Sequence, residues 1–148
     1  MRDAAIALKP LVARLARDVS WGDCDPAGII FYPNYFRWID AGTWNLFFTV
    51  GLTAEGMRAE YPQMDMPIVA AQLEFANPAP FGARAEVSSC IEHWGAKSFR
   101  VRHQIVRADG ARLAAGAETR AWVRMAPAGA MRAEPIPESL KSRFFVGA

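Results

Sequence analysis

One segment of this 148-residue chain is helix-periodic and apolar on most of its sides. Apolar or small side chains recur along it at steps of three and four: Tyr35, Ile39, Gly42, Leu46 and Val50. Trp38, Trp44 and Phe48 lie on its other faces. Pro33 and Gly51 bracket it, as is typical of the start and the end of a helix. Such a helix needs cover on most sides, which in a chain this short comes from a sheet wrapped around it or from a second subunit.

Strand patterns with one apolar and one polar face account for most of the remaining chain. One of them, residues 11–21, precedes the helix and carries Arg17 on its apolar side. After the helix, residues 53–61 predict a short second helix. Four alternating segments follow, at residues 69–75, 83–91, 99–105 and 113–125. Asp109-Gly110 predicts a hairpin between the last two. This order predicts an α+β fold of two layers, with one buried helix on an antiparallel sheet.

The alternation also assigns faces to the titratable side chains of the strands. His103 falls on an apolar face and is interpreted as a core histidine with satisfied hydrogen bonds. Glu118 and Arg120 fall on a polar face, so solvation is expected for both. His93 lies at a strand end and is interpreted as a surface residue.

Length and composition bound the class of protein. The chain fits a single domain, residues 1–148, in which residues 1–10 and 130–148 are expected to be peripheral. The net charge is +2 and there is no run of basic residues, so we expect no nucleic-acid partner. Cys24 and Cys90, with two histidines, form no cluster of metal ligands, so we expect free thiols and no metal site. No apolar run reaches the roughly 18 residues of a membrane span, and the N-terminus lacks a secretory signal, so a cytoplasmic location is expected.

The segment with the most chemical information is Trp-Gly-Asp-Cys-Asp-Pro-Ala-Gly-Ile-Ile-Phe-Tyr-Pro-Asn-Tyr, residues 21–35. It places Asp25 in a tight loop just before the helix, where unpaired N–H groups and the positive end of the helix dipole suit carbonyl chemistry. Asp25 there supplies a nucleophile or a general base, or it caps the turn ahead of Pro26. Asp23 is interpreted as a turn residue, and Cys24, which has no neighbouring base, as a packing residue.

This segment, in this order of elements, resembles the hotdog-fold acyl-CoA thioesterases, and most nearly their 4-hydroxybenzoyl-CoA thioesterase branch. The resemblance recurs at Met-Pro-Ile-Val, residues 66–69, and at Lys-Ser-Phe, residues 97–99. It implies a hotdog fold, in which one long buried helix is wrapped by a curved antiparallel sheet of about five strands. It also implies hydrolysis of an acyl-CoA thioester to free acid and CoA, without a metal and without a cofactor beyond the CoA of the substrate. The implied assembly is a homodimer or a dimer of dimers, with sites at subunit interfaces.

The resemblance also assigns roles to individual residues. Asp25 is implied to be the catalytic carboxylate, and the backbone N–H of Tyr32 is implied to bind the thioester oxygen. Four positions are implied to bind substrate: Asp40, Pro67, Lys97 and Ser98. For Asp40 the sequence leaves a second interpretation open, an ion pair with Arg37 three positions away on the helix. The implied substrate is an aryl-CoA, such as 4-hydroxybenzoyl-CoA or benzoyl-CoA, or a short- or medium-chain acyl-CoA. The alternative is a hotdog protein that binds acyl-CoA or a protein partner without hydrolysis.

Overall fold

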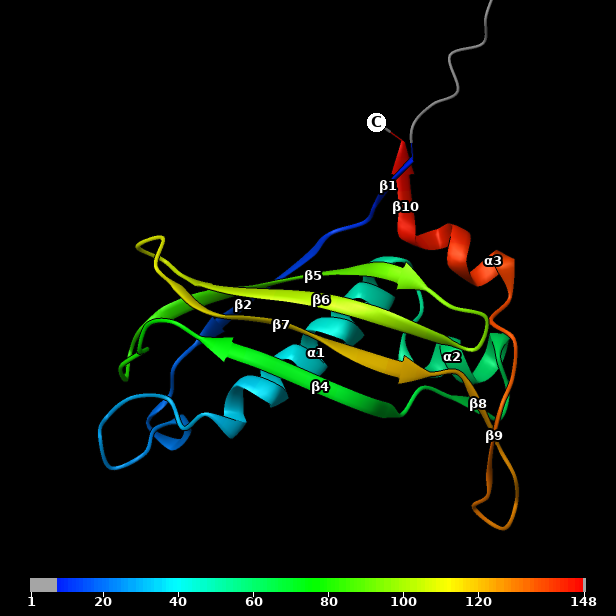
Figure 1. Cartoon of the computed structure of the whole chain (residues 1–148), viewed down its shortest axis with the longest axis horizontal. Helices are drawn as coiled ribbons and strands as arrows, with labels where there is room; N and C mark the ends of the chain where they lie inside the picture. The colour runs from blue at the N-terminus through cyan, green and yellow to red at the C-terminus, as the bar shows by residue number, and fades with distance from the viewer. Residues whose placement is uncertain (1–7, 148) are drawn as a thin grey trace, which may run out of the picture.

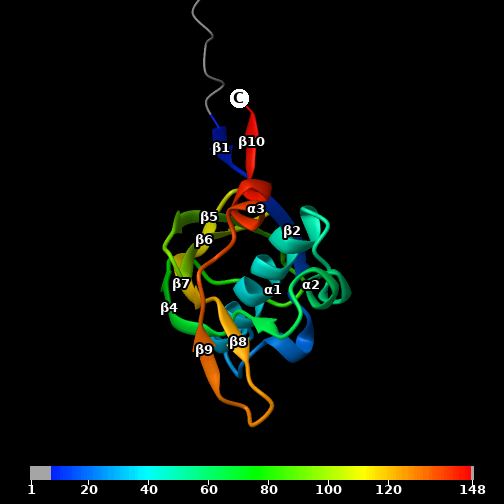
Figure 2. The same ribbon diagram turned by 90° about the vertical axis from the view of Figure 1, so that its right-hand side faces the viewer.

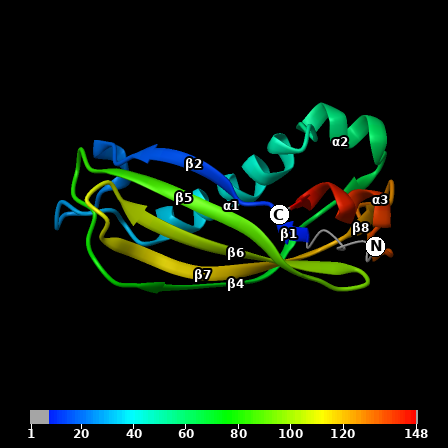
Figure 3. The same ribbon diagram turned by 90° about the horizontal axis from the view of Figure 1, so that it is seen from above.

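The computed structural model describes residues 8–147. Its largest elements are one long helix, α1 (Pro33–Thr49), and a five-stranded antiparallel sheet with the strand order β2-β5-β6-β7-β4 (Figure 1). The five strands are β2 (Ala13–Asp18), β4 (Ile68–Phe75), β5 (Arg84–Trp94), β6 (Ser98–Arg107) and β7 (Arg112–Ala121). Seen from above, α1 runs along one face of this curved sheet (Figure 3). The predicted α+β arrangement of one long helix on an antiparallel sheet is confirmed.

Shorter elements surround this helix and sheet. In chain order they are β1 (Leu8–Pro10), η1 (Trp21–Asp23), α2 (Ala54–Glu60), β3 (Met64–Asp65), β8 (Val123–Met125), β9 (Met131–Ala133), α3 (Glu138–Lys141), η2 (Ser142–Phe144) and β10 (Phe145–Gly147). Helix α2 confirms the short helix predicted at residues 53–61. The β1–β10 ribbon and the β8–β9 hairpin project from opposite sides of the molecule (Figure 2). Among the helices of residues 8–147, none has the length and apolar character needed to cross a membrane.

Local sequence explains where α1 begins and ends. Pro33 lies in its first turn, where a missing N–H costs nothing, and Tyr32 is its N-cap. At the other end, Gly51 has φ +83°, a left-handed conformation that glycine adopts without strain. This reversal lets the Leu52 N–H donate to the carbonyl of Phe47 at 2.8 Å, which satisfies a group that the helix end leaves unpaired. The predicted helix boundaries are confirmed.

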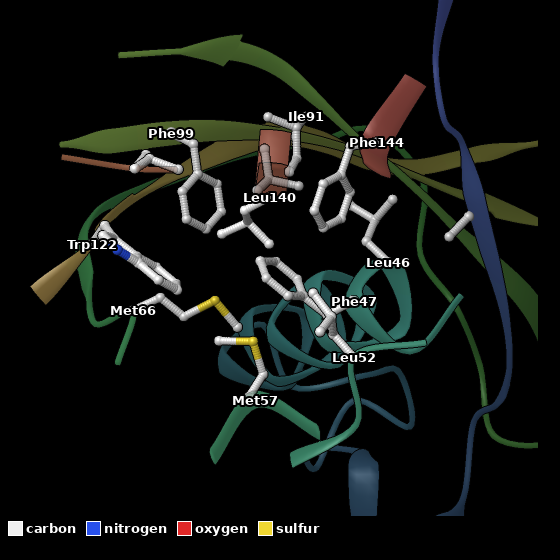
Figure 4. Close-up of a cluster of buried hydrophobic side chains, with 13 residues drawn as sticks. Leu46, Phe47, Leu52, Met57, Met66, Ile91, Phe99, Trp122, Leu140 and Phe144 are labelled. Atoms are coloured by element: carbon white, nitrogen blue, oxygen red, sulfur yellow. The ribbon is translucent and has the colours of Figure 1, made fainter. Parts of the chain in front are cut away.

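The core lies between α1 and the sheet and consists of two apolar clusters along the helix. One cluster surrounds the second half of α1, where Phe47 packs against Phe99 and Phe144 with ring centroids 5.9 and 4.9 Å away (Figure 4). The other cluster surrounds the first half and includes Tyr35 and Ile39. Burial of this apolar surface is the main force that holds α1 on the sheet.

The three aromatic side chains on the other faces of the helix differ in their exposure to solvent. Trp38 is only 6% exposed, because it packs into the cluster around the first half of α1. Trp38 therefore has the cover that the sequence predicts for this helix. Trp44 is half-buried and packs against the other cluster. Phe48 is 49% exposed, so of the three it alone leaves a large apolar area on the helix surface.

The C-terminal segment contributes to the core more than the sequence predicts. Leu140 and Phe144 are fully buried beside α1 (Figure 4). Ile136 is buried in the same cluster. The Ile136 N–H also donates to the carbonyl of Ala96 at 2.8 Å, which ties the segment to the β5–β6 turn. Ile136, Leu140 and Phe144 therefore belong to the core, although the sequence predicts that residues 130–148 are peripheral.

Gly42 sets how closely α1 approaches the sheet, and replacing it should destabilise the fold. A Cβ at Gly42 would lie 2.5 Å from Ser89 Oγ and 3.1 Å from Val87 Cγ1. Alanine favours the helix by about 1 kcal/mol, but here it displaces a hydroxyl from its 2.8 Å contact with His103 Nδ1. We expect Gly42→Ala to lower the free energy of unfolding in urea by about 1–3 kcal/mol. Gly22→Ala, which meets no atom within 4 Å, is the control, and an unchanged value for Gly42→Ala would contradict the packing argument.

Candidate functional site

Asp23 holds the loop ahead of α1 in place. Its carboxylate oxygen Oδ2 accepts hydrogen bonds from the N–H and the hydroxyl of Ser20, at 2.8 and 2.7 Å. Its carbonyl accepts from the N–H of Phe31 at 2.8 Å and from Asn34 Nδ2 at 2.9 Å. These bonds connect the end of β2 to the start of α1, so Asp23 has the turn-holding position that the sequence predicts.

Asp25 lies at the tip of the same loop with one carboxylate oxygen anchored. Oδ1 accepts a hydrogen bond from the Ala27 N–H at 2.8 Å, and the Asp25 carbonyl accepts from the Gly28 N–H at 2.9 Å. Gly28 has φ +76°, which closes this tight turn. Within residues 8–147, Oδ2 of Asp25 accepts no hydrogen bond, and the residue is only half-buried. Asp25 therefore presents one fixed and one free carboxylate oxygen.

The backbone N–H of Tyr32 is a free donor at the start of α1. Asn34 and Tyr35 donate backward to the carbonyls of Phe31 and Tyr32, at 2.9 and 3.1 Å, and Pro33 has no N–H. Among the described residues, no group accepts a hydrogen bond from the Tyr32 N–H. This donor points from the positive end of the helix dipole, so it suits a carbonyl oxygen that gains negative charge.

An aromatic cluster, defined here as Phe31, Tyr32, Tyr35 and Phe75, lies beside this donor. The Tyr32 ring packs edge-on against Phe31 and Phe75, with centroids 5.5 and 6.2 Å away. Tyr35 and Phe75 are 5.4 Å apart. Phe75 ends β4 and is exposed, as are Phe31 and Tyr32, so the start of α1 borders an open aromatic surface.

Tyr35 gives this region a measurable response to alkaline pH. Burial raises the pKa of Tyr35 to about 12, and the nearby charge of Arg107 offsets this only in part. Because tyrosine in an unfolded chain titrates near pH 10, the unfolded state loses its proton first. Stability is therefore complete below about pH 10 and falls as the pH rises toward 12. We expect Tyr35→Phe to lose less unfolding free energy than the parent between pH 9 and 11, and equal slopes in urea titrations would contradict this.

Glu118 and Arg120 face α1, not solvent, which corrects the sequence assignment. Their side chains are 0% and 4% exposed, and Arg120 Nε donates to Glu118 Oε1 at 2.7 Å. The other face of β7 carries small side chains, among them Ala115 and Ala117. The sequence pattern therefore assigns that alanine-rich face to the core and the Glu118 face to solvent. Mutual neutralisation explains how both charges remain buried.

A buried polar chain, defined here as Ser89, His103, Thr43, Glu118 and Arg120, runs between α1 and the sheet. Ser89 Oγ lies 2.8 Å from His103 Nδ1, and His103 Nε2 lies 3.5 Å from Thr43 Oγ1. The Thr43 hydroxyl donates to Glu118 Oε1 at 2.5 Å. The prediction of a buried, hydrogen-bonded His103 is confirmed.

Two properties of this chain limit its chemistry. Serine, histidine and glutamate are residue types of hydrolytic triads, but Ser89, His103 and Glu118 are each 1% exposed, so no substrate carbonyl reaches them. Burial raises the pKa of Glu118, but His103, whose Nε2 lies 3.8 Å from Oε1, the charge of Arg120 and the Thr43 hydroxyl together lower it below its ordinary value. Glu118 is thus an ionised structural partner of Arg120.

Asp40 is the exposed end of this chain. Arg120 Nη2 donates to Asp40 Oδ1 at 2.5 Å, so the partner of Asp40 is Arg120 and not Arg37. The Asp40 side chain is 47% exposed, although that of Arg120 is almost fully buried. Asp40 also lines a polar hollow of about 630 Å³ together with Asp23 and Asn34. The carboxylate therefore has a fixed side and an open side.

Pro67, Lys97 and Ser98 lie at the far end of the sheet from Asp25. The Pro67 carbonyl accepts from the Ala121 N–H at 3.1 Å, and Ser98 pairs with Ala121 across β6 and β7. Lys97 is exposed and directly precedes Ser98 in the β5–β6 turn. Figure 1 shows this turn and the loop ahead of α1 at opposite ends of the sheet. One copy of the chain therefore does not bring the predicted site residues together.

Sequence reasoning missed Arg120, Glu118 and Phe75 as neighbours of the site. Phe75 and Tyr32 lie 43 positions apart, and only the position of β4 beside α1 joins them. For Glu118 and Arg120 a signal existed, because side chains two apart on a strand share a face and opposite charges there form an ion pair.

Comparisons with known proteins agree with this geometry. The family model described as "Thioesterase-like superfamily" matches residues 19–144. The 4-hydroxybenzoyl-CoA thioesterase of Pseudomonas sp. (strain CBS-3) is 38% identical over 90 residues, which are 60% of this chain and 64% of that protein. The match therefore spans less than two thirds of this curated relative's length.

Solved structures extend the similarity to most of the chain. The structure of the 4-hydroxybenzoyl-CoA thioesterase from Pseudomonas sp. strain CBS-3 has a TM-score of 0.82 and 29% identity, covering 90% of this chain and 99% of that one. An aspartate-to-asparagine mutant of 4-hydroxybenzoyl-CoA thioesterase complexed with 4-hydroxybenzoyl-CoA has a TM-score of 0.82 and 28% identity, covering 90% and 98%. A gentisyl-coenzyme A thioesterase has a TM-score of 0.76 and 29% identity, covering 86% and 98%.

Proposed function

Since this chain belongs to the thioesterase-like superfamily and has the hotdog fold, we propose that it hydrolyses an acyl-CoA thioester to free acid and CoA. The observation that carries the proposal is the free N–H of Tyr32 in the same loop as the half-exposed carboxylate of Asp25. Similarity to proteins named 4-hydroxybenzoyl-CoA and gentisyl-CoA thioesterases favours an aryl acyl group, such as 4-hydroxybenzoyl or benzoyl. The exposed aromatic cluster offers ring faces against which such a group packs.

The proposed chemistry uses Asp25 and Tyr32 in different roles. In the reaction an oxygen from water joins the acyl carbon, the carbon–sulfur bond breaks, and CoA leaves as the thiol. Asp25 either attacks the acyl carbon to give a mixed anhydride that water then cleaves, or removes a proton from the attacking water. The Tyr32 N–H donates to the oxygen that becomes negative, which is worth about 3 kcal/mol for one such donor. Substrate held by an aspartate-to-asparagine mutant of a similar enzyme supports an essential aspartate.

The separation of the site residues supports a site shared between two copies. β4 is an edge strand, and within residues 8–147 its outer side pairs with no other strand. Leu73 and Phe75 lie on the side of β4 that faces the helix. Leu73 is buried there, but Phe75 is 49% exposed, and Val69 near the start of the strand is 61% exposed. Exposed apolar edge strands pair readily with another strand. A second copy provides that strand and covers these side chains.

An antiparallel β4–β4 contact about a two-fold axis has a direct consequence for the site. β4 spans about 26 Å at the usual rise per residue. Reversal places the Phe75 end of β4 in one copy, against which Tyr32 packs, beside the end of β4 that follows Pro67 in the other copy. We therefore propose a homodimer, or a dimer of dimers, in which Asp25 and Tyr32 of one copy act with Pro67 and the Lys97–Ser98 turn of the second. Asp40 faces the acyl group, and the exposed Lys97 binds a CoA phosphate.

A panel of thioesters tests this function. Purified protein is incubated with 4-hydroxybenzoyl-, benzoyl-, acetyl- and hexanoyl-CoA, and thiol release is followed with a thiol reagent. We expect the fastest release from an aryl ester. Faster release from an aliphatic ester would contradict the aryl preference. Binding of the esters by calorimetry without any thiol release would contradict hydrolysis and favour the non-hydrolytic alternative.

A further inference from the structure

We propose that Arg120 is a positioning residue, which holds Asp40 so that its open side accepts a hydrogen bond from a hydroxyl group on the acyl part of the substrate. The proposal rests on the proposed function, in which Asp40 faces the acyl group. It assigns a role in specificity to a buried side chain that does not touch substrate itself.

Arg120 is held at three points. Nε donates to Glu118 Oε1 at 2.7 Å, Nη1 donates to the carbonyl of Met66 at 3.3 Å, and Nη2 donates to Asp40 Oδ1 at 2.5 Å. The planar guanidinium cannot turn without losing at least one of these bonds. Because the side chain is 4% exposed, water does not replace a lost partner easily. The direction of the bond to Asp40 is therefore set from inside the core.

The bonds form a closed ring between α1 and β7. Asp40 and Thr43 are three positions apart on α1, so their side chains lie on one face of the helix. Glu118 and Arg120 are two positions apart on β7 and share a face of the strand. Thr43 bonds Glu118, Glu118 bonds Arg120, and Arg120 bonds Asp40. The ring fixes the rotation of α1 against the sheet, and with it the side chain of Asp40.

Charge balance indicates that Asp40 serves more than the ion pair. Glu118 and Arg120 already neutralise one another inside the core. Asp40 adds a second negative charge beside Arg120, at the point where the chain reaches the surface, and the hollow that Asp40 lines also contains Arg17 and Arg37. Its Oδ1 is occupied by Arg120, and among the described residues nothing donates to Oδ2. An oriented, ionised acceptor of this kind discriminates strongly between ligands with and without a matching donor.

The test compares two esters that differ in a single hydroxyl group, 4-hydroxybenzoyl-CoA and benzoyl-CoA. The measured quantity is the ratio of their kcat/KM values. Arg120→Lys keeps a cation beside Glu118 but loses the planar fork that reaches both carboxylates. We expect the ratio to fall about tenfold, mainly through KM for the hydroxylated ester, while kcat/KM for benzoyl-CoA changes about twofold or less. The matched control is Arg124→Lys, because Arg124 makes a similar forked pair with Glu134 on the surface, at 2.6 and 3.0 Å.

A double variant separates positioning from direct contact. If Arg120 acts through Asp40, Asp40→Asn and Asp40→Asn/Arg120→Lys should show the same ratio. A ratio that falls further in the double variant would overturn the proposal, because Arg120 would then act on the substrate by another route. Thr43→Val, which removes the hydroxyl bond to Glu118, should lower the ratio, and Thr43→Ser should restore it. This pair keeps the test open if Arg120→Lys does not fold.

Binding without turnover separates this proposal from the proposed function. In thioether analogues with a methylene group between the sulfur and the carbonyl, hydrolysis is blocked, and calorimetry gives their dissociation constants. If the parent prefers the hydroxylated analogue and Arg120→Lys loses the preference, the positioning role stands even when no thioester is hydrolysed. If the parent hydrolyses esters but Arg120→Lys and Thr43→Val keep its ratio, the positioning role is wrong and the function stands. A parent with no preference for the hydroxyl also overturns the proposal.

Discussion

Asp25→Asn should lower kcat for thioester hydrolysis by about 1,000-fold. Asparagine keeps a carbonyl oxygen at the position of Oδ1, so the bond from the Ala27 N–H and the shape of the turn remain. What is lost is the negative charge that attacks the acyl carbon or removes a proton from water. The expected result is therefore a large loss in kcat with little change in binding. Thiol release gives kcat, and calorimetry with the thioether analogue of 4-hydroxybenzoyl-CoA gives the affinity.

The matched control for this variant is Asp18→Asn. Asp18 ends β2 and bonds Arg84 at the surface at 2.9 Å, so the same chemical change there should alter kcat by about twofold or less. If Asp25→Asn retains more than about a tenth of the parent kcat, its carboxylate is neither nucleophile nor base. Asp25 would then be a turn residue like Asp23.

Ala71→Lys should separate the proposed dimer and abolish most activity. Ala71 lies near the middle of β4 and is exposed in one copy, so lysine should be tolerated by the isolated chain. In a two-fold contact the substitution occurs twice, and it buries charged groups against an apolar surface. We expect sedimentation to show a monomer at micromolar concentration, and thiol release to fall about 100-fold or more, because the shared site is then incomplete.

Two measurements distinguish loss of the dimer from loss of the fold. Circular dichroism and the urea midpoint should match the parent, since the monomer core does not include Ala71. Gln104→Lys, an exposed position on the opposite face of the sheet, is the control and should keep both assembly and activity. A parent protein that sediments as a stable monomer and still hydrolyses thioesters would refute the shared site. So would full activity in monomeric Ala71→Lys.

Features encoded over short distances could be predicted from the sequence. The start and end of α1 follow from a proline and a glycine within or next to the helix. The turn between β6 and β7 follows from Asp109 and Gly110, whose φ of +90° is the conformation that the Asp-Gly pair favours. The turn role of Asp23 likewise depends on bonds to residues 3 to 11 positions away. In each case the cause lies in the same short stretch of chain.

Features that depend on distant partners could not be predicted in this way. The side of β7 that faces the core depends on whether a buried cation finds a carboxylate, and Asp40 meets Arg120 across 80 positions of sequence. A run of alanines on the outer face made the opposite assignment equally consistent with alternation. The Trp38 side chain is covered by members of its apolar cluster that lie on the sheet. Periodicity within one helix does not reveal these partners.

Local sequence was enough to place Asp25 in a turn at the start of a helix, because turn and helix signals lie within residues 21–35. It was also enough to predict one helix on an antiparallel sheet, because apolar periodicity records which elements need cover. Only the tertiary structure separated Asp25 and Tyr32 from Pro67, Lys97 and Ser98, and only it joined Asp40 to Arg120. Distances between elements depend on strand order and register, and these arise from contacts summed over the whole core.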